Sequence, residues 1–147
     1  RDFCLSRGLG DVYKRQDIYK KQVEELEQLG IAHFYGFQSD PRPFYTEADC
    51  VVLPSYHEGM SNVLLEAAAT GRPVITSNIP GCRESVENGK SGLLVEVKNK
   101  EMLYQAMKKM LHCSREEREK MGKAGREKMK REFRKEAVVE RTVRSLE

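Results

Sequence analysis

Tryptophan is absent from this sequence of 147 residues, and aromatic side chains make up only 7% of it. No apolar run approaches the length needed to cross a bilayer, and no Asp-x-Asp metal motif occurs. The four cysteines are widely scattered and lack the paired spacing of a zinc site; they are Cys4, Cys50, Cys82 and Cys113. We therefore expect no metal site, and free thiols in a reducing cytoplasm.

The sequence also has little net charge, because its positive and negative side chains nearly balance and leave a net charge of +3. A surplus this small gives no reason to expect nucleic-acid binding. The positive charge belongs to the C-terminal part, since residues 114–147 contain 12 Lys or Arg against 8 Glu. A solvated helix with i, i+4 ion pairs accounts for this pattern, and the alternative is weak peripheral contact with anionic lipid.

The most informative stretch runs from Cys50 to Gly71. Its first four residues, Cys-Val-Val-Leu, are typical of a buried strand, which ends at Pro54. A helix is expected from about Ser61 or Asn62, both good N-cap residues, and Gly71 occupies a position where helices stop. A strand, a glycine-containing turn and a helix N-terminus together present unpaired amides at one point. This arrangement suits an anion, and phosphate above all.

Two carboxylates accompany that turn. Glu58 lies on the turn itself, and Glu66 shares a helix face with Asn62 at a spacing of i, i+4. A carboxylate would repel a phosphate, but it can accept hydrogen bonds from two hydroxyl groups, so a ribose diol or a sugar would suit these residues. Spacing alone favours a simpler interpretation, in which Glu58 stabilises the helix dipole and Glu66 is a surface residue.

Strands and helices alternate along residues 17–97, which predicts an α/β fold: a Rossmann-like parallel sheet flanked by helices, followed by a helical C-terminal tail. The expected strands are residues 31–37, 50–53, 73–76 and 93–97. The expected helices are residues 17–29, 40–48, 61–70, 80–84 and 100–112, one that begins at a Ser114 capping box, and 135–146. Ligands of such sheets bind where strands end, here in the loops 36–39, 55–61 and 77–83.

Several segments resemble the C-terminal, donor-binding domain of GT-B glycosyltransferases, and within these the large retaining group called family 4. The segments are Leu53-Pro54-Ser55, Glu58-Gly59, Leu65-Glu66-Ala67, Gly71-Arg72-Pro73-Val74 and Gly92-Leu93-Leu94-Val95. The Glu-x7-Glu signature of that family corresponds here to Glu58 and Glu66. The likeness extends from about Tyr19 to the C-terminus. Agreement of separate segments in order and spacing is far more specific than a single glycine motif.

The resemblance implies roles for individual residues. Glu66 would hold the ribose diol, and Glu58, the candidate catalytic residue, would position the donor sugar. The amides of the turn and helix start would stabilise the pyrophosphate, and the donor-binding residues there are Gly59, Met60, Ser61, Asn62 and Val63. The loop after the first expected strand would line the nucleobase through Gly36 and Phe37, with Tyr35 as a further candidate.

The segment Pro80-Gly81-Cys82-Arg83-Glu84 looks like enzymes that build bacterial surface polysaccharides. Two interpretations of Arg83 stay open: it approaches a phosphate or a sugar acid, or it pairs with Glu84 or Glu87. Cys82 is expected to be a packed residue rather than a nucleophile, because nothing beside it would lower the pKa of its thiol. Core packing is also the interpretation for Phe34.

The predicted function is transfer of a sugar, with retention, from a nucleotide sugar to a glycan or lipid-linked acceptor in bacterial surface polysaccharide synthesis. The donor is expected to be a UDP-sugar rather than a GDP- or ADP-sugar, and no metal or other cofactor is expected. A complete GT-B enzyme has two domains, so the acceptor-binding N-terminal domain is expected to be missing and this chain to be inactive alone. The expected location is the cytoplasm, or the inner face of the membrane as a peripheral protein.

Two alternatives remain at this stage. One is another GT-B enzyme, such as a nucleotide-sugar 2-epimerase, which would need His and Asp groups that we do not identify here. The other is a non-enzymatic, receiver-like α/β binding module, which would need clustered acidic residues where Asp49 stands alone.

Residues 1–16 show neither a clear strand nor a helical period, and they look like translated sequencing-adapter read-through. We expect this segment to be a non-native leader that contributes no strand. The nucleotide-sugar-binding domain would then occupy residues 17–147.

Overall fold

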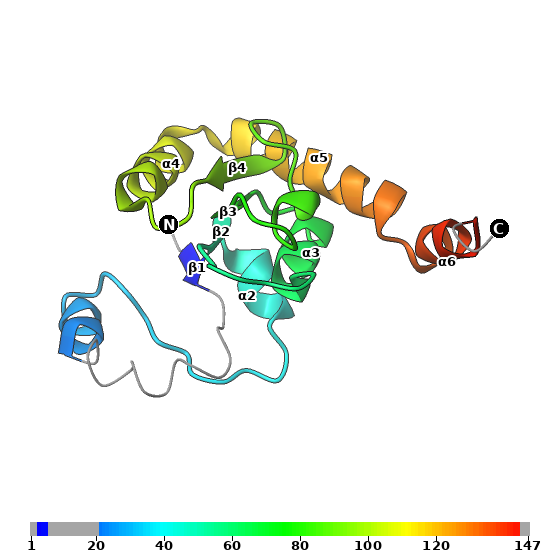
Figure 1. Ribbon diagram of the computed structural model, residues 1–147. Helices are drawn as coiled ribbons and strands as arrows, with labels where there is room; N and C mark the ends of the chain where they lie inside the picture. Colours follow the sequence, from blue (N-terminus) through cyan, green and yellow to red (C-terminus); the bar gives the residue numbers. More distant parts are fainter. Residues whose placement is uncertain (1–2, 6–20, 145–147) are drawn as a thin grey trace. The chain divides into compact units, whose positions relative to one another are not determined.

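The computed structural model describes residues 3–5 and 21–144 (Figure 1). The chain divides into two compact units, which we describe separately. The larger unit comprises residues 1–6 and 42–147, and the smaller one residues 7–41. Within the described residues, no helix is both long and apolar enough to cross a membrane.

A four-stranded parallel sheet forms the centre of the larger unit. Its strands are β1 (Phe3–Leu5), β2 (Cys50–Leu53), β3 (Val74–Ser77) and β4 (Gly92–Val95). They lie side by side in sequence order, with Val51 opposite Val74 and Val74 opposite Gly92. Strands β2 and β3 are buried along their whole length, as expected for a parallel sheet that is covered on both faces. Three of the expected strands are therefore confirmed within one or two residues at their ends.

Strand β1 corrects the expectation that residues 1–16 contribute no strand. Phe3 lies opposite Cys50 and Leu5 lies opposite Val52, in parallel register. Three residues are too few for an alternating pattern to be recognised, and the strand forms because β2 offers an edge to pair with. The non-native origin of residues 1–16 stays a prediction.

The described helices of this unit agree with the expected ones. They are α2 (Arg42–Glu47), α3 (Asn62–Ala69), the 3-10 turn η1 (Arg83–Ser85), α4 (Lys100–His112), α5 (Arg115–Glu132) and α6 (Lys135–Arg144). Gly71 follows α3 at φ +78, the left-handed conformation that ends many helices. Ser114 and Glu117 form the expected capping box at the start of α5.

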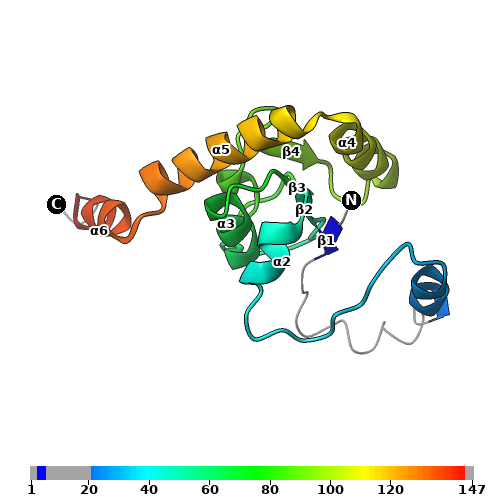
Figure 2. The same cartoon turned by 180° about the vertical axis from the view of Figure 1, so that it is seen from behind.

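Alternate residues of each strand face different helices, because side chains of a strand point to opposite faces in turn. Val51 and Val74 join a buried cluster with residues of α2 and α3. Val52 and Ile75 join a second cluster with residues of α4. Figures 1 and 2 show α3 and α4 on opposite sides of the sheet. The expected fold class, a parallel sheet flanked by helices, is therefore confirmed.

Helix α5 packs on the end of α3 through a glycine contact. Gly122 lies so close to Gly71 that a Cβ at position 122 would stand 1.8 Å from the Gly71 carbonyl oxygen. Gly125 is less constrained, since a Cβ there would meet Ala68 and Ser91 at 3.6 Å, an ordinary contact. The backbones of Gly122 and Gly71 thus lie in close contact, and this contact fixes the distance between α5 and the end of α3.

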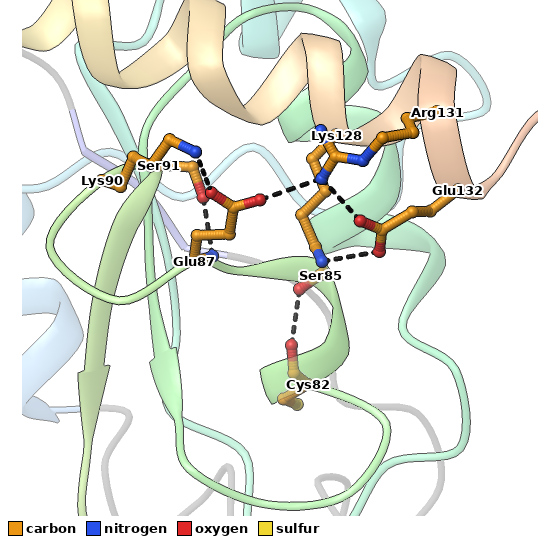
Figure 3. A network of polar contacts seen from close by, with 8 residues as sticks. All are labelled: Cys82, Ser85, Glu87, Lys90, Ser91, Lys128, Arg131 and Glu132. Carbon is orange, nitrogen blue, oxygen red and sulfur yellow. Dashed lines mark hydrogen bonds and ion pairs between the residues drawn. The ribbon is translucent and has the colours of Figure 1, made fainter.

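An ion-pair network holds the C-terminal half of α5 against the segment that leads from η1 to β4 (Figure 3). Arg131 Nη2 lies 3.0 Å from Glu87 Oε1 and 2.6 Å from Glu132 Oε1. Lys90 Nζ lies 2.6 Å from Glu87 Oε2, and Lys128 Nζ lies 2.7 Å from Glu132 Oε2. Hydrogen bonds from Lys90 and then from Arg131 lower the pKa of Glu87, so its carboxylate stays charged at neutral pH.

The smaller unit differs from the sequence-based expectation. It contains a helix at residues 21–28, but the strand expected at residues 31–37 is wrong, because the described backbone there joins no sheet. Phe34 is 66% exposed, which also corrects the expectation that it packs in a core. An apolar run can resemble a strand in sequence, yet a strand requires a partner to pair with. In the larger unit, the expected loops after β2 and β3 lie at the carboxyl edge of the sheet.

Candidate functional site

Two loops meet at the carboxyl edge of the sheet. One joins β2 to α3 (residues 54–61), and the other joins β3 to η1 (residues 78–82). The Ser61 amide donates a hydrogen bond to the Gly81 carbonyl at 3.1 Å. Gly81 adopts φ +86, and a Cβ there would stand 1.7 Å from the carbonyl oxygen of Gly59. The loops pack backbone against backbone, which fixes the shape of the first loop.

Free amides gather where α3 begins. The helix starts at Asn62, and its first internal bond runs from the Leu65 amide to the Ser61 carbonyl, at 3.1 Å. Within the described part of the chain, the amides of Asn62, Val63 and Leu64 have no hydrogen-bond partner, and the Ser61 side chain does not cap them. Unpaired N–H groups at the positive end of a helix dipole favour an anion.

The amide of Ser61 does not belong to that set. Its N–H group, which was expected to bind pyrophosphate, already donates to the Gly81 carbonyl in this structure. Gly59 and Met60, just ahead of it, are both exposed. The amides available to an anion are therefore those on either side of Ser61.

Glu58 is half-buried on the loop between β2 and α3. The Ser55 hydroxyl donates a hydrogen bond to Glu58 Oε1 at 2.7 Å, which restrains the direction of the carboxylate. Next to it, Tyr56 and His57 are exposed, and the Lys98 ammonium lies 6.0 Å from the centre of the Tyr56 ring. Glu58 is thus held by its own loop, beside the start of α3.

Glu66 is exposed in the second turn of α3 and shares its face with Asn62, as predicted. The opposite face, with Leu64, Ala67 and Ala68, is buried. Tyr45 of α2 donates its hydroxyl to Glu66 Oε2 at 3.1 Å. The Tyr45 side chain is buried, so this bond joins a fixed group in the core to a carboxylate at the surface.

Tyr45 and Ser55 belong to the site through these hydrogen bonds, although neither was expected there from the sequence. Ser55 could have been found, because it lies three residues before Glu58 in a turn, where such hydroxyls commonly bond nearby groups. Tyr45 could not, because no local spacing relates it to Glu66, and only the packing of α2 on α3 brings them together.

Cys82 is the last residue of the second loop, and Arg83 is the first residue of the turn η1 that follows it. Arg83 Nε lies 3.5 Å from Glu84 Oε1, and the Glu84 carboxylate also accepts a hydrogen bond from the Gly81 amide at 2.7 Å. Of the two interpretations of Arg83, the structure shows the ion pair with Glu84. Cys82 is fully buried in the cluster under α3, and burial raises the pKa of its thiol, which agrees with a packing role.

The expected nucleobase residues lie in the smaller unit. Tyr35, Gly36 and Phe37 are exposed there, and Gly36 adopts φ +63. The rings of His33 and Tyr35 make an edge contact with centroids 4.5 Å apart. Their assignment to a base pocket stays a prediction.

Other reactive groups in the described residues are engaged elsewhere. Asp49, the acidic residue considered for a receiver-like module, forms an ion pair with Arg118 of α5, with Asp49 Oδ1 at 3.2 Å from Arg118 Nη2. Burial raises the pKa of Cys50 to about 12, so this thiol stays protonated. No group of three or more His, Cys, Asp or Glu side chains in the described ranges could hold a metal ion.

The fold and the site define a parallel α/β domain with unpaired amides at the start of a helix and two nearby carboxylates. Residues 11–128 match the family model described as "Glycosyl transferases group 1", and this chain belongs to that family. The lipopolysaccharide core biosynthesis glycosyltransferase LpsE of Rhizobium meliloti is 30% identical over 132 residues, which are 90% of this chain and 38% of LpsE. The capsular polysaccharide biosynthesis glycosyltransferase CapM of Staphylococcus aureus is 33% identical over 102 residues, 69% of this chain and 27% of CapM. The chain thus spans well under half the length of these relatives.

Solved structures place the chain within the larger fold. The C-terminal domain of the glycosyl transferase group 1 protein LpcC from Francisella tularensis matches with a TM-score of 0.68 and 25% identity, covering 82% of this chain and 65% of that one. Sucrose-phosphate synthase from Thermosynechococcus elongatus matches with a TM-score of 0.78 and 28% identity, covering 98% of this chain and 38% of the synthase. Anabaena HepE in complex with UDP has the same fold, at a TM-score of 0.78 and 20% identity, over 98% of this chain and 40% of HepE. The resemblance to the C-terminal domain of a GT-B glycosyltransferase is confirmed.

Proposed function

We propose that this chain binds the nucleotide-sugar donor, a UDP-sugar, for a retaining glycosyltransferase of bacterial surface polysaccharide synthesis. The observation that carries the proposal is the juxtaposition, at one sheet edge, of unpaired α3 amides and two carboxylates that are each restrained by a hydroxyl donor. Amides suit the pyrophosphate, and carboxylates suit the hydroxyl-bearing parts on either side of it.

Each residue has a role in this proposal. The amides of Asn62, Val63 and Leu64, with those of Gly59 and Met60 ahead of them, bind the pyrophosphate and stabilise the negative charge that builds on the leaving UDP. Glu66 accepts hydrogen bonds from the ribose hydroxyls. Glu58 positions the donor sugar, and Gly36, Phe37 and Tyr35 line the nucleobase.

The acceptor, a glycan or a lipid-linked saccharide, would bind to a further domain, so this chain alone would bind the donor weakly and catalyse nothing. The enzyme would work in the cytoplasm or at the inner face of the membrane, without a metal. LpsE and CapM, whose names refer to lipopolysaccharide core and capsular polysaccharide biosynthesis, support the choice of pathway class.

The binding site can be tested on this chain by NMR titration of the isotopically labelled protein with UDP. We expect the largest early shifts at the amides of Gly59, Met60, Asn62, Val63 and Leu64, because these N–H groups would gain an anion as partner. The Ser61 amide serves as an internal control and should shift less, since it already donates to Gly81. Shifts confined to the basic helices α5 and α6 would indicate simple charge attraction and would contradict the proposal.

A further inference from the structure

The hydroxyl of Tyr45 reaches Glu66 from the inside of the protein. Tyr45 is only 3% exposed, and its ring belongs to the cluster that contains Val51, Leu64 and Ala67. Its hydroxyl oxygen lies 3.1 Å from Glu66 Oε2. A phenol ring packed in a core has little freedom, so the direction from which this proton is donated is fixed.

A second hydrogen bond joins helix α2, which carries Tyr45, to the segment that follows α3. The guanidinium of Arg72, just beyond the end of α3, donates a hydrogen bond to the Thr46 carbonyl. Two bonds from neighbouring residues of α2 therefore join it to α3 and the turn that follows. This arrangement makes α2 a support for the α3 face on which Glu66 lies.

A hydrogen bond from one hydroxyl group restrains the side chain of an exposed glutamate. Without a partner, the carboxylate rotates among several side-chain conformations, and a ligand must order it on binding. A bond to Oε2 limits this rotation and leaves Oε1 and a second lone pair of Oε2 for hydroxyl groups of a ligand. A neutral phenol does not cancel the carboxylate charge, whereas a lysine or arginine in its place would.

We propose that Tyr45 is a positioning residue that orients Glu66 for a vicinal diol, and that it thereby sets the preference of this site for ribonucleotides over deoxyribonucleotides. The inference rests on the proposed function, because it takes Glu66 as the ribose-binding group. It adds a second residue, from a different helix, to the recognition of the ribose.

The test measures dissociation constants for UDP and for 2′-deoxy-UDP from the shifts of the α3 amides. Wild-type protein should bind UDP more tightly than 2′-deoxy-UDP. Tyr45→Phe keeps the ring and removes the hydroxyl; we expect UDP to bind about three- to tenfold more weakly, the usual worth of one hydrogen bond, with a smaller change for 2′-deoxy-UDP. Tyr104→Phe, on an exposed tyrosine of α4, is the matched control and should change neither constant.

A double variant separates positioning from a general structural effect. If Tyr45 acts through Glu66, then Tyr45→Phe combined with Glu66→Gln should bind UDP no more weakly than Glu66→Gln alone. Additive losses, or an equal loss for the two nucleotides in Tyr45→Phe, would overturn the positioning role. A normal UDP constant in Tyr45→Phe beside a weakened one in Glu66→Gln would overturn it as well. If Glu66→Gln itself binds UDP as the wild type does, the proposed function fails at Glu66.

Discussion

Gly81→Ala should be among the most destabilising single substitutions in the domain. The left-handed backbone at φ +86 costs a residue with a Cβ roughly 1–2 kcal/mol. The new methyl group would also stand 1.7 Å from the Gly59 carbonyl oxygen, and such overpacking costs about 1–3 kcal/mol more. We expect the two costs to add, because the opposing atom is backbone and cannot rotate away. Urea unfolding measures the loss.

Gly89→Ala provides the matched control for this prediction. Gly89 has a similar backbone, with φ +77, but a Cβ there would meet nothing within 4 Å. It should therefore lose only the backbone cost, roughly 1–2 kcal/mol. Equal losses in the two variants would mean that the two loops at the sheet edge are not in close backbone contact. Gly81→Ala should also shift the NMR resonances of Gly59 and Ser61, whereas Gly89→Ala should not.

Gly122→Ala is the second substitution with a large expected effect. Alanine is a better helix former than glycine by about 1 kcal/mol, so helix propensity alone predicts stabilisation of α5. The structure predicts the opposite, because the methyl group would stand 1.8 Å from the Gly71 carbonyl oxygen and force α5 away from α3. Overpacking of this kind costs about 1–3 kcal/mol, and the opposing backbone atom cannot rotate away, so the cost should exceed the propensity gain. We expect a net loss of up to about 2 kcal/mol, measured by urea or thermal unfolding.

Gly125→Ala, one helical turn further along α5, is the control for this pair. Its Cβ would make ordinary contacts at 3.6 Å, so the propensity gain of up to about 1 kcal/mol should remain. The two variants should therefore move the unfolding midpoint in opposite directions. Movement in the same direction would contradict the close packing of α5 on α3.

The elements that sequence could predict are those whose signals are local. The β2 strand, the start of α3, the stop at Gly71 and the capping box at Ser114 each carry their own pattern of residues, and all four appear as expected. The face shared by Asn62 and Glu66 follows from helical spacing alone.

The misinterpreted elements depend on partners distant in sequence. Residues 31–37 have a strand-like composition but pair with no strand among the described residues, whereas Phe3–Leu5 has little pattern and pairs with β2. The bond between Ser61 and Gly81 and the bond between Tyr45 and Glu66 each join separate segments of the chain. Both bonds change the composition of the site. The first engages the Ser61 amide, and the second adds the Tyr45 hydroxyl.

The most direct test of the proposed site compares Glu66→Gln with Glu58→Gln in a full-length enzyme that contains this domain. Each change keeps the shape of the side chain but replaces one acceptor oxygen with a donor amide. Glu66→Gln should weaken the binding of UDP itself by about 1.5–3 kcal/mol, because hydrogen bonds to a charged acceptor are lost. Glu58→Gln should leave UDP affinity intact and lower turnover of the UDP-sugar, because its partner is the transferred sugar. Normal UDP binding and normal turnover in both variants would contradict the assignment of these two carboxylates to the donor.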